Sequence, residues 1–123
     1  MTTQEVANQL VTYCKEGKYP EAYGLYAQDA VSVEMPGVPN EVTHGLENIL
    51  KGFENWASTI EETHGGSVGE PVVAGNHFTV PMMSDVTFKG MGRCVMEELC
   101  VYEVEDGKIK KASFFYDPKV FAG

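Results

Sequence analysis

Residues 93–117 read RCVMEELCVYEVEDGKIKKASFFYD, and this stretch decides the fold class. Apolar and polar residues alternate on both sides of Asp106-Gly107, a dipeptide favoured in the two-residue turns that join antiparallel strands. The pattern therefore predicts a hairpin with strands over about residues 93–105 and 108–117.

The sequence before this hairpin continues the strand pattern. Two further strands are predicted at about residues 67–74 and 77–88, with turns at residues 75–76 and 89–92. A shorter alternating run from Val31 to Met35 predicts a strand nearer the N-terminus. These segments together favour an antiparallel meander in the second half of the chain.

Helical signals are confined to the first half. Thr2 and Glu5 have the spacing of a capping box, Gly17 ends that first helix, and Pro20 begins a short second one. A third helix is predicted by apolar residues at three- and four-residue steps, namely Leu46, Ile49, Leu50, Phe53 and Trp56. Helices followed by antiparallel strands predict an α+β fold with the helices on one face of a curved sheet.

Composition limits the classes of function. The 123 residues suit a single domain, residues 1–123, and 43% hydrophobic residues can form its core. The formal charge of −9 disfavours nucleic acids and anionic membrane surfaces as partners. We find no apolar run of membrane-spanning length and no basic, apolar leader, so we expect a cytoplasmic protein.

The metal-ligating residue types do not form a recognised motif. The cysteines, Cys14, Cys94 and Cys100, are odd in number and lack CxxC spacing, which predicts reduced thiols. The histidines are far apart in the sequence and belong to no HExxH pattern. We therefore expect neither a metal nor another cofactor.

Several short strings, in this order, resemble the SnoaL-like family of the nuclear transport factor 2-like superfamily, which also contains ketosteroid isomerase. These strings are YPEA (19–22), YAQDAV (26–31), HGLENI (44–49), DGKI (106–109) and FYDP (115–118). The resemblance implies a cone-shaped roll of N-terminal helices on a curved, mostly antiparallel sheet. It also implies a deep pocket for a small hydrophobic molecule, and often a homodimer.

The catalytic positions of these relatives hold other residues here. The isomerase base corresponds to Met35, its second acid to Cys100 and its phenol to a position near Leu10, so ketosteroid isomerase activity is not expected. The acidic position in the last strand of the similar cyclases corresponds to Phe114. If strand alternation continues, Glu34 points away from the pocket.

Glu98 is the main catalytic candidate. Placing Cys100 and Tyr102 inward, as in the relatives, also places Glu98 inward, where poor solvation would raise its pKa toward the range of a general acid or base. A β-bulge would instead turn Glu97 inward. His44 is a second candidate, either as a proton shuttle at the pocket mouth or in a capping role.

The remaining predicted pocket wall is apolar and adaptable, which suits a mostly apolar ligand. The candidate ligand-binding residues are Tyr13, Met35, Trp56, Met82, Cys100, Tyr102, Phe114 and Tyr116. The alternative is that these side chains fill a core with no cavity.

The opposite face of the sheet carries Val95, Leu99, Val101 and Phe115. An exposed apolar patch of this kind predicts a homodimer formed through the sheet. The sequence thus favours a small-molecule pocket protein. Proton-transfer chemistry (isomerisation, cyclisation or hydration) is one interpretation, and a non-catalytic ligand-binding or dimerisation module that has lost the family's acids is the other.

Overall fold

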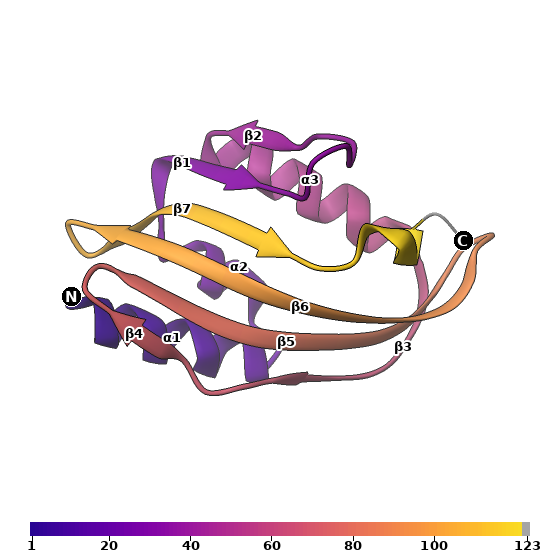
Figure 1. Cartoon of the computed structure of the whole chain (residues 1–123), viewed down its shortest axis with the longest axis horizontal. Helices are drawn as coiled ribbons and strands as arrows, with labels where there is room; N and C mark the ends of the chain where they lie inside the picture. Colours follow the sequence, from indigo (N-terminus) through magenta and orange to yellow (C-terminus); the bar gives the residue numbers. More distant parts are fainter. Residues whose placement is uncertain (122–123) are drawn as a thin grey trace.

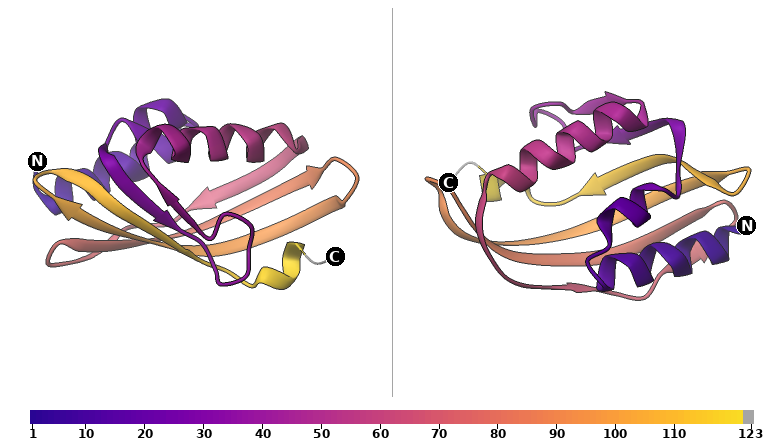
Figure 2. Two further views of the ribbon diagram at one scale, coloured as in Figure 1. Left: turned by 90° about the horizontal axis from the view of Figure 1, so that it is seen from above. Right: turned by 180° about the vertical axis from the view of Figure 1, so that it is seen from behind.

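The computed structural model describes the backbone of residues 1–121 and the side chains of residues 1–119. Helices α1 (Thr3–Lys15), α2 (Tyr19–Tyr23) and α3 (Leu46–Ser58) gather on one face of a curved sheet (Figures 1 and 2). A short 3₁₀ helix, η1 (Pro118–Phe121), follows the last strand. The predicted α+β architecture is confirmed.

The sheet is mostly antiparallel. Within the described residues its order is β2-β1-β7-β6-β5-β3, and β4 also pairs with β5. The strands are β1 (Tyr26–Val33), β2 (Val42–His44), β3 (Ile60–Val68), β4 (Val72–Ala74), β5 (His77–Phe88), β6 (Gly92–Glu105) and β7 (Lys108–Phe115). Strands β1 and β7 are parallel, and this pairing brings the first half of the chain beside the last strand.

The local signals for turns and helix ends are confirmed. Thr2 and Glu5 form the capping box, with the Glu5 amide donating to Thr2 Oγ1 at 3.1 Å and the Thr2 amide donating to Glu5 Oε1 at 2.9 Å. Asp106 and Gly107 both have positive φ, 52° and 76°. Such backbone angles fit the twist between antiparallel strands.

The sheet differs from the prediction in several places. The strand expected from Val31 to Met35 is β1, which begins at Tyr26 and ends at Val33, and the short strand β2 was not predicted because it lies in a segment expected as a loop. The expected strand at 67–74 is divided into the end of β3 and the separate strand β4, and β3 begins already at Ile60. Residues 61–67 are all exposed, so this edge segment lacks the apolar alternation that reveals a half-buried strand. Pairing with β5 defines it instead.

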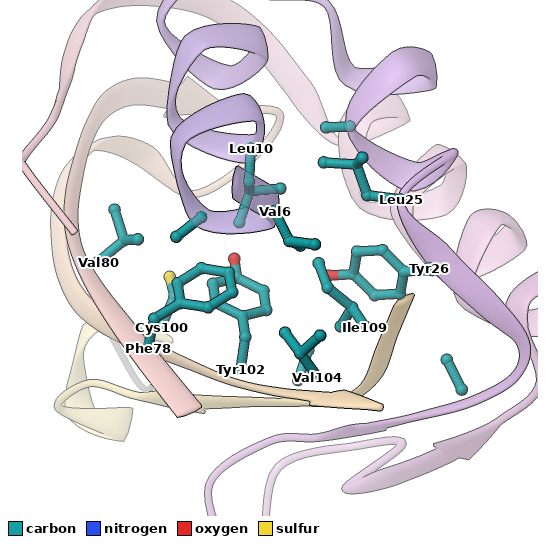
Figure 3. Close-up of a cluster of buried hydrophobic side chains, with 14 of the residues drawn as sticks. Val6, Leu10, Leu25, Tyr26, Phe78, Val80, Cys100, Tyr102, Val104 and Ile109 are labelled. Atoms are coloured by element: carbon teal, nitrogen blue, oxygen red, sulfur yellow. The ribbon is translucent and has the colours of Figure 1, made fainter. Parts of the chain in front are cut away.

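The main core lies where α1 covers the sheet (Figure 3). Val6 and Leu10 of α1 pack with Phe78 of β5 and Tyr102 of β6, and the two aromatic rings stack with centroids 4.8 Å apart. All four side chains are at most 3% exposed. We call this region, under α1, the closed end of the sheet.

The burial pattern of β6 decides which side chains face the helices. Met96 and Cys100 are buried, whereas Val95 and Leu99 are about half exposed. Glu98 is therefore on the inner face, and Glu97 is exposed on the outer face.

No helix among the described residues is long and apolar enough to cross a membrane.

Candidate active site

Three neighbouring strands bring two carboxyl groups and a phenol together. Glu34 directly follows β1, Tyr116 directly follows β7, and Glu98 lies within β6. Since β7 lies between β1 and β6 and is paired with both, Glu34 and Glu98 come from the two strands that flank β7. The Tyr116 hydroxyl donates to Glu34 Oε2 at 2.9 Å.

The position of Glu34 corrects the sequence-based expectation. The expectation set Met35 inward, which would turn Glu34 outward. In the structure Ser32 pairs with Ala112 of β7, a residue buried in the main core, so Ser32 and, by alternation, Glu34 lie on the inner face. The Glu34 amide donates to the Glu41 carbonyl oxygen at 2.7 Å, which continues the pairing of β1 with β2. The Glu34 carboxyl therefore reaches Tyr116 and interacts electrostatically with Glu98.

Glu98 is half-buried between inward-facing, mostly apolar neighbours. It pairs with Met82 of β5 across the sheet, and the Cys100 thiol donates to its Oε1 at 3.6 Å. Burial raises the pKa of Glu98, and the negative charge of Glu34 raises it further. The thiol hydrogen bond opposes both effects. The expected inward position and raised pKa are both present in the structure.

Glu34 and Tyr116 influence each other. Burial raises the pKa of Glu34, while the hydrogen bond from Tyr116 lowers it. The pKa of Tyr116 is raised first by burial, then by its bond to Glu34 and by the charges of both carboxylates. A hydrogen bond from the Met35 backbone acts in the opposite direction on Tyr116. The phenol is thus protonated at neutral pH and available as a donor.

The carboxyl pair lacks a compensating cation. Within the described residues, no lysine, arginine or histidine forms an ion pair with Glu34 or Glu98 or contributes to the shift of either pKa. The residues described also contain no group of three or more side chains able to hold a metal ion. The site is therefore an acidic pair in mostly apolar surroundings.

An aromatic row from α2 and α3 adjoins this pair. Burial raises the pKa of Tyr23, and the charges of Glu98 and Glu34 add to the shift. The Tyr23 ring lies 5.3 Å from that of Phe53, which lies 6.3 Å from Trp56. These half-exposed rings supply an apolar surface next to the carboxyl groups.

His44 lies apart from the carboxyl pair. Its side chain is exposed at the end of β2, and its carbonyl accepts a hydrogen bond from Asn48 Nδ2 at 3.0 Å. Within the part of the chain that the structure describes, the His44 imidazole makes no hydrogen bond or ion pair. Its catalytic role stays a prediction.

The predicted ligand-binding residues occupy two environments. Cys100 and Tyr102 are buried in the main core. Partly buried positions are taken by Tyr13, Met35, Met82, Phe114 and Tyr116, and Trp56 is 37% exposed. Their contact with a ligand stays a prediction. Glu34 was missed because the alternation of this strand was anchored on Met35, whereas the pairing of Ser32 with the buried Ala112 of β7 sets the opposite parity.

The sequence model of the SnoaL-like domain matches residues 1–116. The chain belongs to the SnoaL-like family. This confirms the resemblance seen in the sequence. A search of functionally curated proteins finds no match.

Solved structures agree with this assignment. A Mesorhizobium loti protein named as a candidate SnoaL-like polyketide cyclase is 36% identical, with a TM-score of 0.89 over 94% of this chain and 100% of that one. A nuclear transport factor 2-like protein from Burkholderia thailandensis is 16% identical, with a TM-score of 0.85 over 99% and 95% of the two chains. TerC, crystallised with polyporic acid, is 13% identical, with a TM-score of 0.78 over 98% and 95%. The last two show a common fold.

Proposed function

We propose that this SnoaL-like protein binds a small, mostly apolar molecule between α3 and the inner face of the sheet and catalyses proton transfer there. The observation that carries the proposal is the half-buried pair of Glu34 and Glu98. Burial raises the pKa of both, and no cation in the described part of the chain forms an ion pair with either. Carboxyl groups tuned in this way can accept and donate protons near neutral pH. The SnoaL-like family includes cyclases and isomerases, which supports proton transfer as the activity of this protein.

The chemistry follows from the two carboxyl groups acting on one bound molecule. One removes a proton from a carbon atom or a water molecule while the other donates a proton to an oxygen atom. Half-buried, apolar surroundings strengthen the electrostatic interactions of both carboxyl groups with the bound molecule, because water competes less with them. Isomerisation, cyclisation and hydration all consist of steps of this kind.

A non-catalytic ligand-binding module is the second candidate. The residues at the catalytic positions of the relatives favour this alternative. Leu10 stands near the position of the phenol and Cys100 at the position of the second acid, and both are buried core residues here, 2% and 0% exposed. Under this alternative, Glu34 and Glu98 would only orient a ligand. The two candidates differ in whether the pair moves protons.

Deuterium exchange tests catalysis without knowledge of the substrate. The probes are β-tetralone and related ketones with acidic α-hydrogens, incubated with the protein in D₂O and followed by proton NMR. We expect exchange above the buffer rate, and Glu34→Gln or Glu98→Gln to lower the enzymatic rate by about 10²- to 10⁴-fold, the usual contribution of a positioned acid or base.

Glu97→Gln is the matched control, because Glu97 is the neighbour of Glu98 on the outer face. It should leave the exchange rate unchanged. Probes that bind without exchange above the buffer rate would favour the non-catalytic alternative. Exchange that survives both inner-face substitutions would show that other groups carry the reaction.

We also propose that two copies pair through the outer face of the sheet. Val95, Leu99 and Phe115 are 51%, 52% and 49% exposed there. The residues that line a groove of about 550 Å³ on this face include Pro81, Met83, Glu97, Leu99 and Phe115. Covering each large apolar side chain would contribute roughly 1.5 to 3 kcal/mol.

A further inference from the structure

The two carboxyl groups of the site have different hydrogen-bond donors. Glu34 accepts from a phenol at 2.9 Å, whereas Glu98 accepts from a thiol at 3.6 Å. A hydroxyl donor stabilises a carboxylate much more strongly than a thiol, which is a weak donor. The hydrogen bonds in the structure therefore stabilise the ionised form of Glu34 more than the ionised form of Glu98.

Among the described residues, no lysine, arginine or histidine forms an ion pair with Glu34 or Glu98 that would offset this inequality. The titratable groups that interact with Glu34 or Glu98 are Tyr23 of α2, Cys100 and Tyr102 of β6, and Tyr116 after β7. On α3, Glu47 and Lys51 pair with each other at 3.5 Å and Glu54 is exposed. On β5, the residue opposite Glu98 is the uncharged Met82.

We propose that Tyr116 is a positioning residue that keeps Glu34 ionised as the base, while Glu98 holds the proton and acts as the acid. This assignment rests on the proposed function of the pair. Two neighbouring carboxyl groups resist simultaneous ionisation, so a proton is taken up first by the group whose carboxylate has the weaker donor. That group is Glu98.

The assignment defines the class of substrate. A protonated Glu98 donates to a neutral acceptor oxygen, such as that of a ketone or an epoxide, while Glu34 faces a carbon-bound hydrogen or a water molecule. An anionic substrate would meet the Glu34 carboxylate, and none of the cations that the structure describes pairs with this group to compensate. The site should therefore select neutral, oxygen-containing apolar molecules over carboxylates.

For a ketone the step is a balanced enolisation. The carbon–hydrogen bond breaks and its proton passes to Glu34, the electron pair forms the carbon–carbon double bond, and the carbonyl oxygen takes the proton of Glu98. Glu34 ends protonated and Glu98 ionised. Return of a proton to carbon from Glu34, and to Glu98 from the enol oxygen, restores the starting state without any redox change.

Carbon-13 NMR of protein labelled at the glutamate carboxyl carbons tests the assignment directly. Signals are identified with Glu34→Gln and Glu98→Gln, and both carboxyl groups are titrated in the unmodified protein. We expect Glu98 to take up its proton at higher pH than Glu34. In Tyr116→Phe the Glu34 midpoint should rise by about one pH unit, the size expected when a charged group loses one hydrogen bond.

Tyr23→Phe is the control, because it removes a phenol that interacts with the pair electrostatically and has no hydrogen bond to either carboxyl in the described structure. It should preserve the order of protonation. The assignment is overturned if Glu34 protonates at the same pH as Glu98 or above it. It is also overturned if a folded Tyr116→Phe protein keeps the Glu34 midpoint. The first result needs no variant of Tyr116, so misfolding of that variant leaves a decisive measurement.

A ligand comparison tests the substrate class. β-Acetylnaphthalene and β-naphthoate have similar shapes but differ in charge, and we expect the carboxylate to bind at least about ten-fold more weakly at neutral pH. Equal or tighter binding of β-naphthoate, or binding of neither probe, would contradict this class. Absence of deuterium exchange with the predicted titration order intact would overturn the proposed catalysis and leave the protonation order standing.

Discussion

Helices α1 and α3 lie over different parts of the same sheet and bury different numbers of their own residues. A second, smaller buried cluster of Val86, Phe88 and Met96 lies at the far end of β5 and β6. Helices α1 and α3 both have 13 residues. Within the described residues, α1 buries Val6, Ala7, Leu10 and Val11, whereas α3 buries only Ile49. We call the region under α3, with Glu34, Glu98 and Tyr116, the open end.

This difference shows how one fold accommodates both a core and a site. Along β6, Tyr102 is 3% exposed under α1, and Glu98 is only half-buried four residues earlier on the same face. A carboxyl group in the position of Tyr102 would lose nearly all contact with water and would be costly without a partner. At the open end the same face tolerates two carboxyl groups.

The outer face of the sheet differs from both ends of the inner face because α1, α2 and α3 all leave it uncovered (Figure 2). If a second copy covers it, Leu99→Lys combined with Val101→Lys should abolish the dimer without unfolding the domain, since each lost contact contributes roughly 1.5 to 3 kcal/mol. Sedimentation velocity measures this change. Val72→Lys, at a position 66% exposed on β4, should leave the dimer intact, and a wild-type monomer at micromolar concentration would refute the proposed interface.

Removing an aromatic ring from each end would test the difference in burial. Phe78→Ala should lower the free energy of unfolding by about 3 to 5 kcal/mol, because Phe78 is 1% exposed and its removal leaves a cavity. Trp56→Ala should cost less than half as much, since Trp56 is 37% exposed. Urea denaturation provides both values, and similar losses at the two ends would contradict the comparison.

Glu98→Gln should stabilise the protein near neutral pH by roughly 1 kcal/mol, a typical cost of an imperfectly solvated polar group. The folded-state pKa of Glu98 is raised, first by burial and then by the charge of Glu34. Its penalty is therefore absent below the unfolded pKa and grows as pH rises through the folded pKa. The stabilisation should vanish in acid.

Urea denaturation over a range of pH values measures this difference, with Glu97→Gln as the exposed control. The control should change stability little at any pH. Destabilisation by Glu98→Gln at neutral pH would indicate that the Glu98 carboxylate takes part in a favourable structural interaction instead.

The smallest expected effect concerns steroid isomerisation. Met35 and Cys100 stand where ketosteroid isomerases have carboxyl groups, and neither side chain can take over those roles. We expect turnover of a standard steroid substrate at the buffer rate. Turnover well above that rate would show that Glu34 and Glu98 can perform the reaction from their different positions.

Local patterns were sufficient for much of the architecture. The inward position of Glu98 was expected from strand alternation once the resemblance to the family had set Cys100 and Tyr102 inward. The capping box at Thr2 and the Asp106-Gly107 turn follow from spacings of a few residues. Each depends on backbone geometry that neighbouring residues determine together. Strand β3 was predicted only in part because its exposed edge position produces no apolar alternation.

The contact between Glu34 and Tyr116 in the candidate active site could not be predicted from local sequence patterns. Glu34 and Tyr116 are separated by 82 positions, and their contact exists because β1 and β7 run parallel side by side and each residue directly follows its strand. The sequence by itself determined the three helices, the capping box of the first and the strands joined by the Asp106-Gly107 turn, since these depend on local periodicity and turn geometry. Only the tertiary structure decided that Glu34 lies on the inner face with Glu98 and that His44 is exposed, because those positions depend on which strands lie side by side and in which register.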